Sequence, residues 1–208
     1  MKIISAKKIF SLLIFLLIFN GLTFAEIITF SADTMTGTAS EKSDRTVLSG
    51  NASVKTEKME ISADTIELTG ENFRTIIATG NVKGIQDKMD FSCGKMTFDR
   101  ETKIALLEDF VRMKDSEKDV DAEAQSIEYD QNNEIAVMQI GVSLKQKNNT
   151  CTGAYAIYNK KTQMLDMSGN PKVVQGNDTF RAQTISLNLD TQEITLDGRV
   201  TGSVTTKK

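Results

Sequence analysis

Apolar and polar residues alternate along most of the chain, in a pattern that recurs about every thirty residues after residue 30. Each copy opens with a small residue and places apolar residues three and five positions later, apart from Gly37 in the first copy. The openers are Ala32, Ala63, Cys93, Ala124, Gly153 and Ala182, at spacings of 31, 30, 31, 29 and 29. Six similar units predict a stacked architecture, in which each unit buries its apolar face against its neighbours.

The alternation within each unit has a period of two, which is typical of β-strands with one buried face. Residues 66–69, 96–99, 127–130 and 185–188 alternate in this way, and turn-forming residues follow each of them. A second alternating segment then returns, at 103–106, 134–137 and 192–196, so the pattern predicts hairpins. The expected fold class is all-β with many short antiparallel strands, and the charged stretch 114–124 is expected to form a solvated loop or edge.

Each unit closes at a corner where glycine and asparagine favour a tight turn or a bulge with positive φ. These corners fall at Gly50, Gly80, Gly141, Gly169 and Gly198, with Asp109 in the third unit. A further strand follows each corner, so the sequence predicts three short strands per unit.

Residues 1–25 have the layout of a secretory signal peptide, with Lys2, Lys7 and Lys8 ahead of an apolar run at 9–19. That run is shorter than the roughly 20 residues needed to span a bilayer, which favours cleavage after Ala25 over an uncleaved anchor. Residues 26–208 are then expected to form one continuous β domain. Export to the periplasm is the corresponding localisation.

The charge balance argues against a nucleic-acid partner. The whole chain carries a formal charge of −3, and residues 1–25 hold three lysines and no acid, so the exported part carries −6. A nucleic-acid-binding surface requires a basic patch, and the sequence shows no basic block.

The residues that usually carry catalysis are missing or isolated. The chain has no histidine, which excludes Ser-His-Asp and Cys-His catalysis and histidine-based metal sites. Asp33 and Asp64 share one repeat position, but Gly94, Gln125 and Ala154 occupy it in other units, which indicates a turn or strand-edge role. We therefore expect no catalytic residue, no metal ligand and no cofactor.

The two cysteines, Cys93 and Cys151, belong to the third and fifth units. Strands lie about 4.8 Å apart within a sheet, so this separation exceeds the roughly 7 Å Cα limit for a disulfide. The sequence predicts two reduced thiols that pack as small apolar side chains.

Residues 62–68 read Ser-Ala-Asp-Thr-Ile-Glu-Leu and residues 78–82 read Ala-Thr-Gly-Asn-Val. Together they resemble the repeat of the LptA/OstA-like proteins, and residues 183–187 with 196–200 follow the same pattern. The resemblance extends over about residues 28–204. The third unit departs from it, with Gly94 in place of aspartate and Asp109-Phe110 in place of Gly-Asn, and the fourth has Gly141-Val142 in place of Gly-Asn-Val.

The resemblance implies an open β-jellyroll that works in the periplasm without enzymatic activity. It would carry lipopolysaccharide or a related glycolipid between the inner and outer membranes, with the acyl chains shielded in an apolar groove. The residues expected to line this groove are Ile66, Leu68, Ile76, Met96, Phe98, Leu106, Ile127, Tyr129, Val137, Ile185 and Leu187. For each of them, ordinary core packing is an equally good interpretation.

The resemblance also implies end-to-end stacking with LptC-like and LptD-like jellyrolls by edge-strand addition, and head-to-tail self-association. The residues expected at these edges are Ile27, Ile28, Phe30, Val200 and Val204, which lie in neutral or apolar segments. Two alternatives to a free carrier remain. One is a membrane-anchored LptC-like component of the same route, and the other is a structural β-repeat protein with a dry core.

Overall fold

The computed structural model describes residues 27–37 and 45–206, so the expected signal peptide and its cleavage site after Ala25 lie outside the described residues. The described chain is almost entirely β, with one short 3-10 helix, η1 (Glu71–Phe73). The strands are β1 (Thr29–Ser31), β2 (Thr34–Gly37), β3 (Arg45–Lys55), β4 (Met59–Thr69), β5 (Thr75–Gln86), β6 (Met89–Asp99), β7 (Ile104–Asp115), β8 (Val120–Asp130), β9 (Ile135–Gln146), β10 (Asn149–Asn159), β11 (Met164–Ser168), β12 (Lys172–Gln175), β13 (Asp178–Arg181), β14 (Thr184–Asn188), β15 (Ile194–Asp197) and β16 (Thr201–Ser203).

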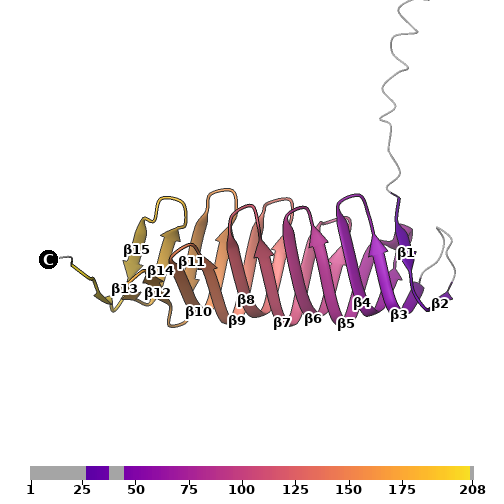
Figure 1. Ribbon diagram of the computed structural model, residues 1–208, viewed down its shortest axis with the longest axis horizontal. Helices are drawn as coiled ribbons and strands as arrows, with labels where there is room; N and C mark the ends of the chain where they lie inside the picture. The colour runs from indigo at the N-terminus through magenta and orange to yellow at the C-terminus, as the bar shows by residue number, and fades with distance from the viewer. Residues whose placement is uncertain (1–26, 38–44, 207–208) are drawn as a thin grey trace, which may run out of the picture.

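The strands stack along one long axis, with β1 and β2 at one end and β13 to β15 near the other (Figure 1). All the pairings are antiparallel, and consecutive strands are neighbours from β3 through β11. The sheet does not close on itself, so the fold is the open, LptA-like β-jellyroll that the resemblance implied. Such hairpin-connected neighbours follow directly from the repeating alternation and turn residues of the sequence.

The central strands are longer than the sequence predicted, because each one runs through a corner. Strands β3 to β10 have 11 or 12 residues each. The ladder between β3 and β4 shifts register at Gly50-Asn51 and then resumes, and the same shift recurs at each later corner up to β10. A β-bulge bends a strand without ending it, so two expected short strands become one bent strand.

The bends divide the sheet into two layers. The first layer contains the parts of β3, β5, β7 and β9 before the bend, the parts of β4, β6, β8 and β10 after it, and β2, β11, β14 and β15. The second layer contains the remaining halves with β1, β12, β13 and β16. Inward side chains of both layers form a single apolar core, as in other sandwiches of two packed sheets.

The charged stretch 114–124 is not an irregular loop or an edge, as the sequence suggested. It is the hairpin that joins β7 and β8, and Lys114 pairs across it with Asp121 in a continuous ladder. Val120, Ala122 and Ala124 are buried while the residues between them face solvent. The alternation is visible in the sequence. Its apolar positions are small residues among many charged ones, however, so it is a weak signal of a strand with one buried face.

Candidate lipid-binding site

Nine of the eleven residues expected to line a groove are buried on the inner face of the first layer. They are Ile66, Leu68, Ile76, Met96, Phe98, Ile127, Tyr129, Ile185 and Leu187. The second layer supplies an apolar inner face of its own, with Ile61, Val82, Leu144, Cys151 and Val173 buried. Of these, the sequence analysis had singled out only Cys151, as a packed thiol. Val82, Leu144 and Val173 lie in the alternating segments that follow a corner, and that alternation is the signal that could have identified them.

Leu106 and Val137 were wrongly placed among the inward residues. Both are half-buried on the outer face, where each pairs with Glu128 of the intervening strand. The inward positions are taken by Ala105 and Ala136, which pair with Tyr129 from either side. A tyrosine ring between two neighbouring strands leaves room only for small side chains beside it, so the larger leucine and valine point outward.

The interior between the layers is closely packed. The cavity there measures only about 20 Å³ and is lined by residues of both layers, including Met89, Ile127, Tyr129, Met138 and Leu144. That volume holds about one water molecule. With the two layers in this position, the interior has no free space of the size of an acyl chain.

A row of polar side chains joins the layers along the side opposite the corners, where the hairpin turns of the two layers meet. We call this row the seam. Its three shortest contacts among the described residues are Gln131 Nε2 to Gln86 Oε1 at 2.8 Å, Lys160 Nζ to Asp115 Oδ2 at 2.9 Å, and Asn149 Nδ2 to Gln192 Oε1 at 2.7 Å. The partners within a contact are 45, 45 and 43 positions apart. From one contact to the next, the second-layer residues 86, 115 and 149 advance by 29 and 34 positions, so the contact recurs roughly once per repeat.

The central contact of the seam is a largely buried ion pair. The side chains of Lys160 and Asp115 are 16% and 5% exposed, and Lys160 also contacts Glu117 at 3.3 Å. Burial lowers the pKa of Lys160, but hydrogen bonds and the charge of Asp115 raise it by more, so its pKa lies above the usual value. Burial also raises the pKa of Tyr158 to about 12. Lys160 therefore stays protonated beside Asp115, and Tyr158 stays neutral.

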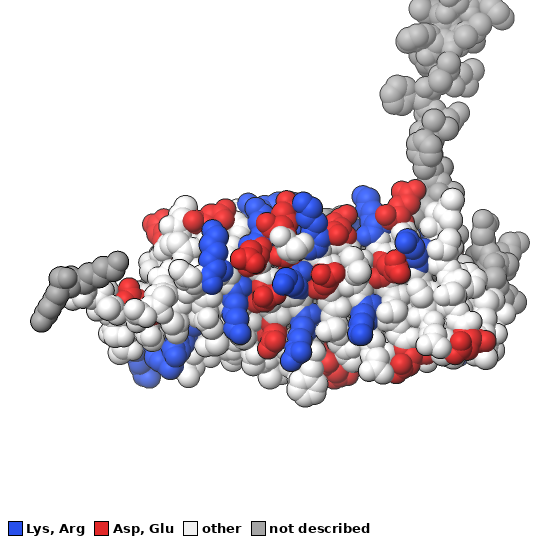
Figure 2. All heavy atoms as spheres, in the orientation of Figure 1, with Lys and Arg blue, Asp and Glu red and all other residues white. Residues whose placement is uncertain are grey.

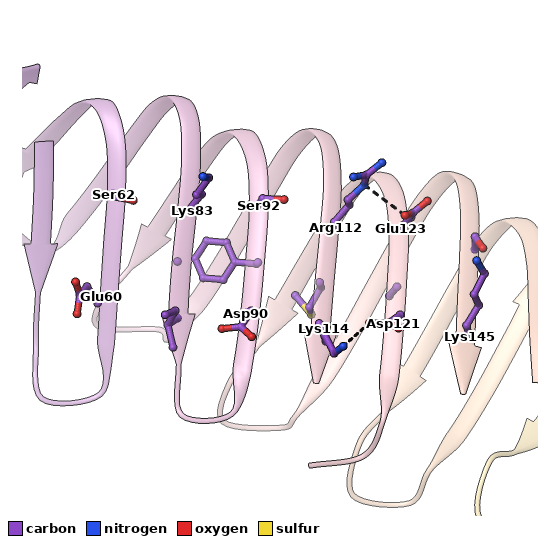
Figure 3. A pocket seen from close by; sticks show the side chains of 16 residues that line it. Glu60, Ser62, Lys83, Asp90, Ser92, Arg112, Lys114, Asp121, Glu123 and Lys145 are labelled. Carbon is purple, nitrogen blue, oxygen red and sulfur yellow. Dashed lines mark ion pairs between the residues drawn. The ribbon is translucent and has the colours of Figure 1, made fainter. Parts of the chain in front are cut away.

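A surface depression of about 660 Å³ lies on the outer face of the second layer between β4 and β9 (Figure 3). Its charged side chains face one another across neighbouring strands, as Arg112 does with Glu123 at 3.3 Å and Lys114 with Asp121 at 4.0 Å. Basic and acidic groups interleave in the same way over the face shown in Figure 2. Because four basic and four acidic residues line this depression, it offers no net charge to an anionic ligand.

Each layer ends, among the described residues, on strands that are paired on one side only. These are β1 and β2 at one end, and β15 and β16 at the other. Of the expected edge residues only Phe30 lies within a strand, while Ile27, Ile28, Val200 and Val204 flank β1 and β16. Ile27 and Val204 are 70% and 66% exposed.

Asp33 and Asp64 support the corners. Asn51 Nδ2 donates to Asp33 Oδ2 at 3.0 Å, and Asn81 Nδ2 donates to Asp64 Oδ2 at 2.9 Å. Each carboxylate thus holds the asparagine of the next corner, which accounts for its repeat position.

The described residues contain no group of three or more potential ligands placed to hold a metal ion. They also contain no helix of the length and hydropathy that a membrane crossing requires.

Residues 29–164 match the family described as "LptA/(LptD N-terminal domain) LPS transport protein". The chain belongs to this family. The match begins with β1, includes all the bent strands and ends at the start of β11, so the corners from Gly50 to Gly141 lie within it, as do all the seam residues named above except Gln192.

Among solved structures, this family member matches LptH of Pseudomonas aeruginosa, described as the LptA homologous periplasmic component of the lipopolysaccharide transport device. The sequences are 12% identical, the match covers 87% of this chain and 96% of that one, and the TM-score is 0.27. A comparison with curated proteins finds no match.

Proposed function

We propose that this protein is a periplasmic carrier of lipopolysaccharide or a related glycolipid, which holds the acyl chains between the two layers of the jellyroll. Family membership together with a continuous apolar interior supports the proposal. Each acyl methylene moved from water into that interior contributes about 0.8 kcal/mol. A protein of net negative charge that binds an anionic glycolipid depends on this apolar contribution, because its overall charge opposes binding.

The free edges at the two ends of the stack support a second part of the proposal. An exposed strand edge adds a strand of a partner through main-chain hydrogen bonds. LptC-like and LptD-like jellyrolls would join at opposite ends, or copies of this chain would join head to tail, so that one apolar interior continues into the next. Cleavage after Ala25 would free the carrier from the membrane, and N-terminal sequencing of the exported protein tests that step.

Phe98 and Phe110 provide a matched pair for testing where the lipid binds. Phe98 is 5% exposed between the layers, whereas Phe110 is 81% exposed at a corner. Each is replaced in turn by the photoreactive analogue p-benzoylphenylalanine, and the protein is irradiated with lipopolysaccharide. We expect a lipopolysaccharide adduct at position 98 and none at position 110.

One observation favours a different function, that of a structural β-repeat protein. The packed interior with its cavity of about 20 Å³ is what a dry core requires. The same cross-linking experiment separates the two functions. A folded variant at position 98 that yields no adduct, together with native mass spectra of residues 26–208 free of lipid, would favour the structural role.

A further inference from the structure

A surface depression along the seam reaches side chains that also line the apolar interior. A depression of about 550 Å³ lies there, and it shares Met89, Tyr129 and Lys160 with the small cavity between the layers. Gln86 and Gln131, the first contact of the seam, also line it. A single layer of side chains therefore separates solvent from the core at this place.

The layers are held together very differently on their two sides. At the corners each bent strand passes covalently from one layer to the other, and ladder hydrogen bonds resume on both sides of the bend. Across the seam, the contacts that join the two layers at Gln86, Asp115, Asn149 and Gln175 are made between side chains. The backbone hydrogen bonds of the adjoining turns, such as Gln131 N to Lys103 O and Ser116 N to Lys88 O, stay within one layer.

The depression also carries lysine side chains, two of which, Lys160 and Lys161, are paired with acidic side chains while the seam is closed. Lys88, Lys118, Lys160 and Lys161 line it together with three acidic residues. Lysine ammonium groups bind phosphate as point charges. This contrasts with the larger outer depression, where basic and acidic residues are equal in number.

We propose that the seam is a gate, and that acyl chains enter the interior sideways through it when the contacts Gln86–Gln131, Asp115–Lys160 and Asn149–Gln192 open. This inference rests on the proposed carrier function. The corners act as the hinge, and the depression beside Lys160 receives a phosphorylated glycolipid headgroup while the chains pass Met89 and Tyr129. Closing of the seam restores the buried ion pair and the two amide contacts.

A reversible cross-link tests the gate directly. Gln86 and Gln131 are replaced by cysteine in a background where Cys93 and Cys151 are alanine, and a short bis-methanethiosulfonate joins the two new thiols. The matched control is the same variant treated with methyl methanethiosulfonate, which modifies both thiols without joining them. A second control joins Arg112→Cys to Glu123→Cys, which pair on the outer face within one layer.

Uptake of purified lipid A is then measured for each form. We expect the cross-linked seam to slow uptake at least tenfold, both controls to take up lipid A as the parent does, and reductant to restore uptake. Cross-linking after loading should slow release by a similar factor. Thermal melting confirms that each form is folded.

Unchanged uptake and release in the cross-linked protein would overturn the gate, because the chains would then enter through the open ends. That result would leave the carrier function standing, since lipid A still binds. If the parent protein binds no lipid A in the same assay, the carrier function fails and the gate fails with it.

Discussion

Gly94 and Asp109 occupy each other's places in the repeat. In the second unit Asp64 lies over the corner glycine Gly80, where a Cβ would stand 2.3 Å from Asp64 Oδ2. In the third unit the aspartate is at the corner and the glycine is on the facing strand, where a Cβ at residue 94 would stand 2.6 Å from Asp109 Cβ. The corner has room for one side chain, and either strand supplies it.

This exchange predicts a double-mutant result. Gly94→Asp alone places two carboxylates in space for one, and we expect it to lower the free energy of unfolding by roughly 1–3 kcal/mol, as overpacking does. Gly94→Asp with Asp109→Gly rebuilds the arrangement of the second unit and should recover most of that loss. Urea unfolding of the two variants and the parent measures the coupling.

The reverse exchange provides the control. Gly80→Asp alone should destabilise the second unit, whereas Asp64→Gly with Gly80→Asp should be tolerated. Additive effects in both pairs would show that the two positions do not share a space.

The fold could be predicted from the sequence because its signals are local. A period of two, turn residues and a repeat of about thirty residues lead to antiparallel hairpins that stack, whatever the details of each unit. Whether the side chains of Leu106 and Val137 face the core or the outer surface could not be predicted in the same way. Both faces of these segments are apolar, and the choice depends on Tyr129 in the neighbouring strand.

The seam was not predicted, although each of its residues is visible in the sequence. Asp115 and Asn149 continue the inward alternation of β7 and β10 to the strand ends, where polar residues look like ordinary turn residues. Their partners lie more than forty positions away, in turns of the other layer. Only the bend of the sheet brings these positions together, and a single sequence contains no signal for that angle.

The lowered pKa of the Asp99 carboxyl group predicts that the protein loses stability in acid. Its hydrogen bonds to the Arg74 guanidinium, followed by those from the Thr102 and Glu101 amides, lower its pKa to about 2. A carboxylate whose pKa is lower in the folded than in the unfolded state stabilises the fold above its unfolded pKa near 4. That contribution disappears as the pH falls from about 4 to about 2.

The melting temperatures of the parent and Asp99→Asn, followed from pH 7 to pH 2, test this expectation. The variant should melt lower at pH 7, and the difference should vanish near pH 2. Arg74→Gln, which removes the largest cause of the shift, should move the acid loss toward higher pH. A difference that persists at pH 2 would show that Asp99 acts through packing.

Cys93 and Cys151 are free and buried, as the sequence predicted. Burial raises the pKa of Cys93 to about 11 and that of Cys151 to about 12. Because the thiolate is the reactive form, both should react with Ellman's reagent at pH 8 at least about 100-fold more slowly than glutathione. In denaturant we expect both thiols to react fully. In the native protein Cys93 should react faster than Cys151, and the variant Cys151→Ser shows which reaction phase belongs to which cysteine.

The free edges predict association that depends on concentration. Phe30 lies in β1, which is paired with β3 alone among the described strands, and its side chain is 42% exposed. Phe30→Lys adds a charge to this edge, which discourages pairing with another strand. Sedimentation velocity over a range of concentrations should show the parent protein forming larger species, with the variant requiring at least tenfold more protein to do so.

Phe110→Lys is the matched control, because Phe110 is more exposed than Phe30 but lies at the corner of β7, a strand in the middle of the stack. It should associate as the parent does if the edges make the contact. Equal weakening by both substitutions would instead indicate general hydrophobic association. A parent protein that stays monomeric throughout would remove self-association from the proposal and leave partner jellyrolls as the occupants of the edges.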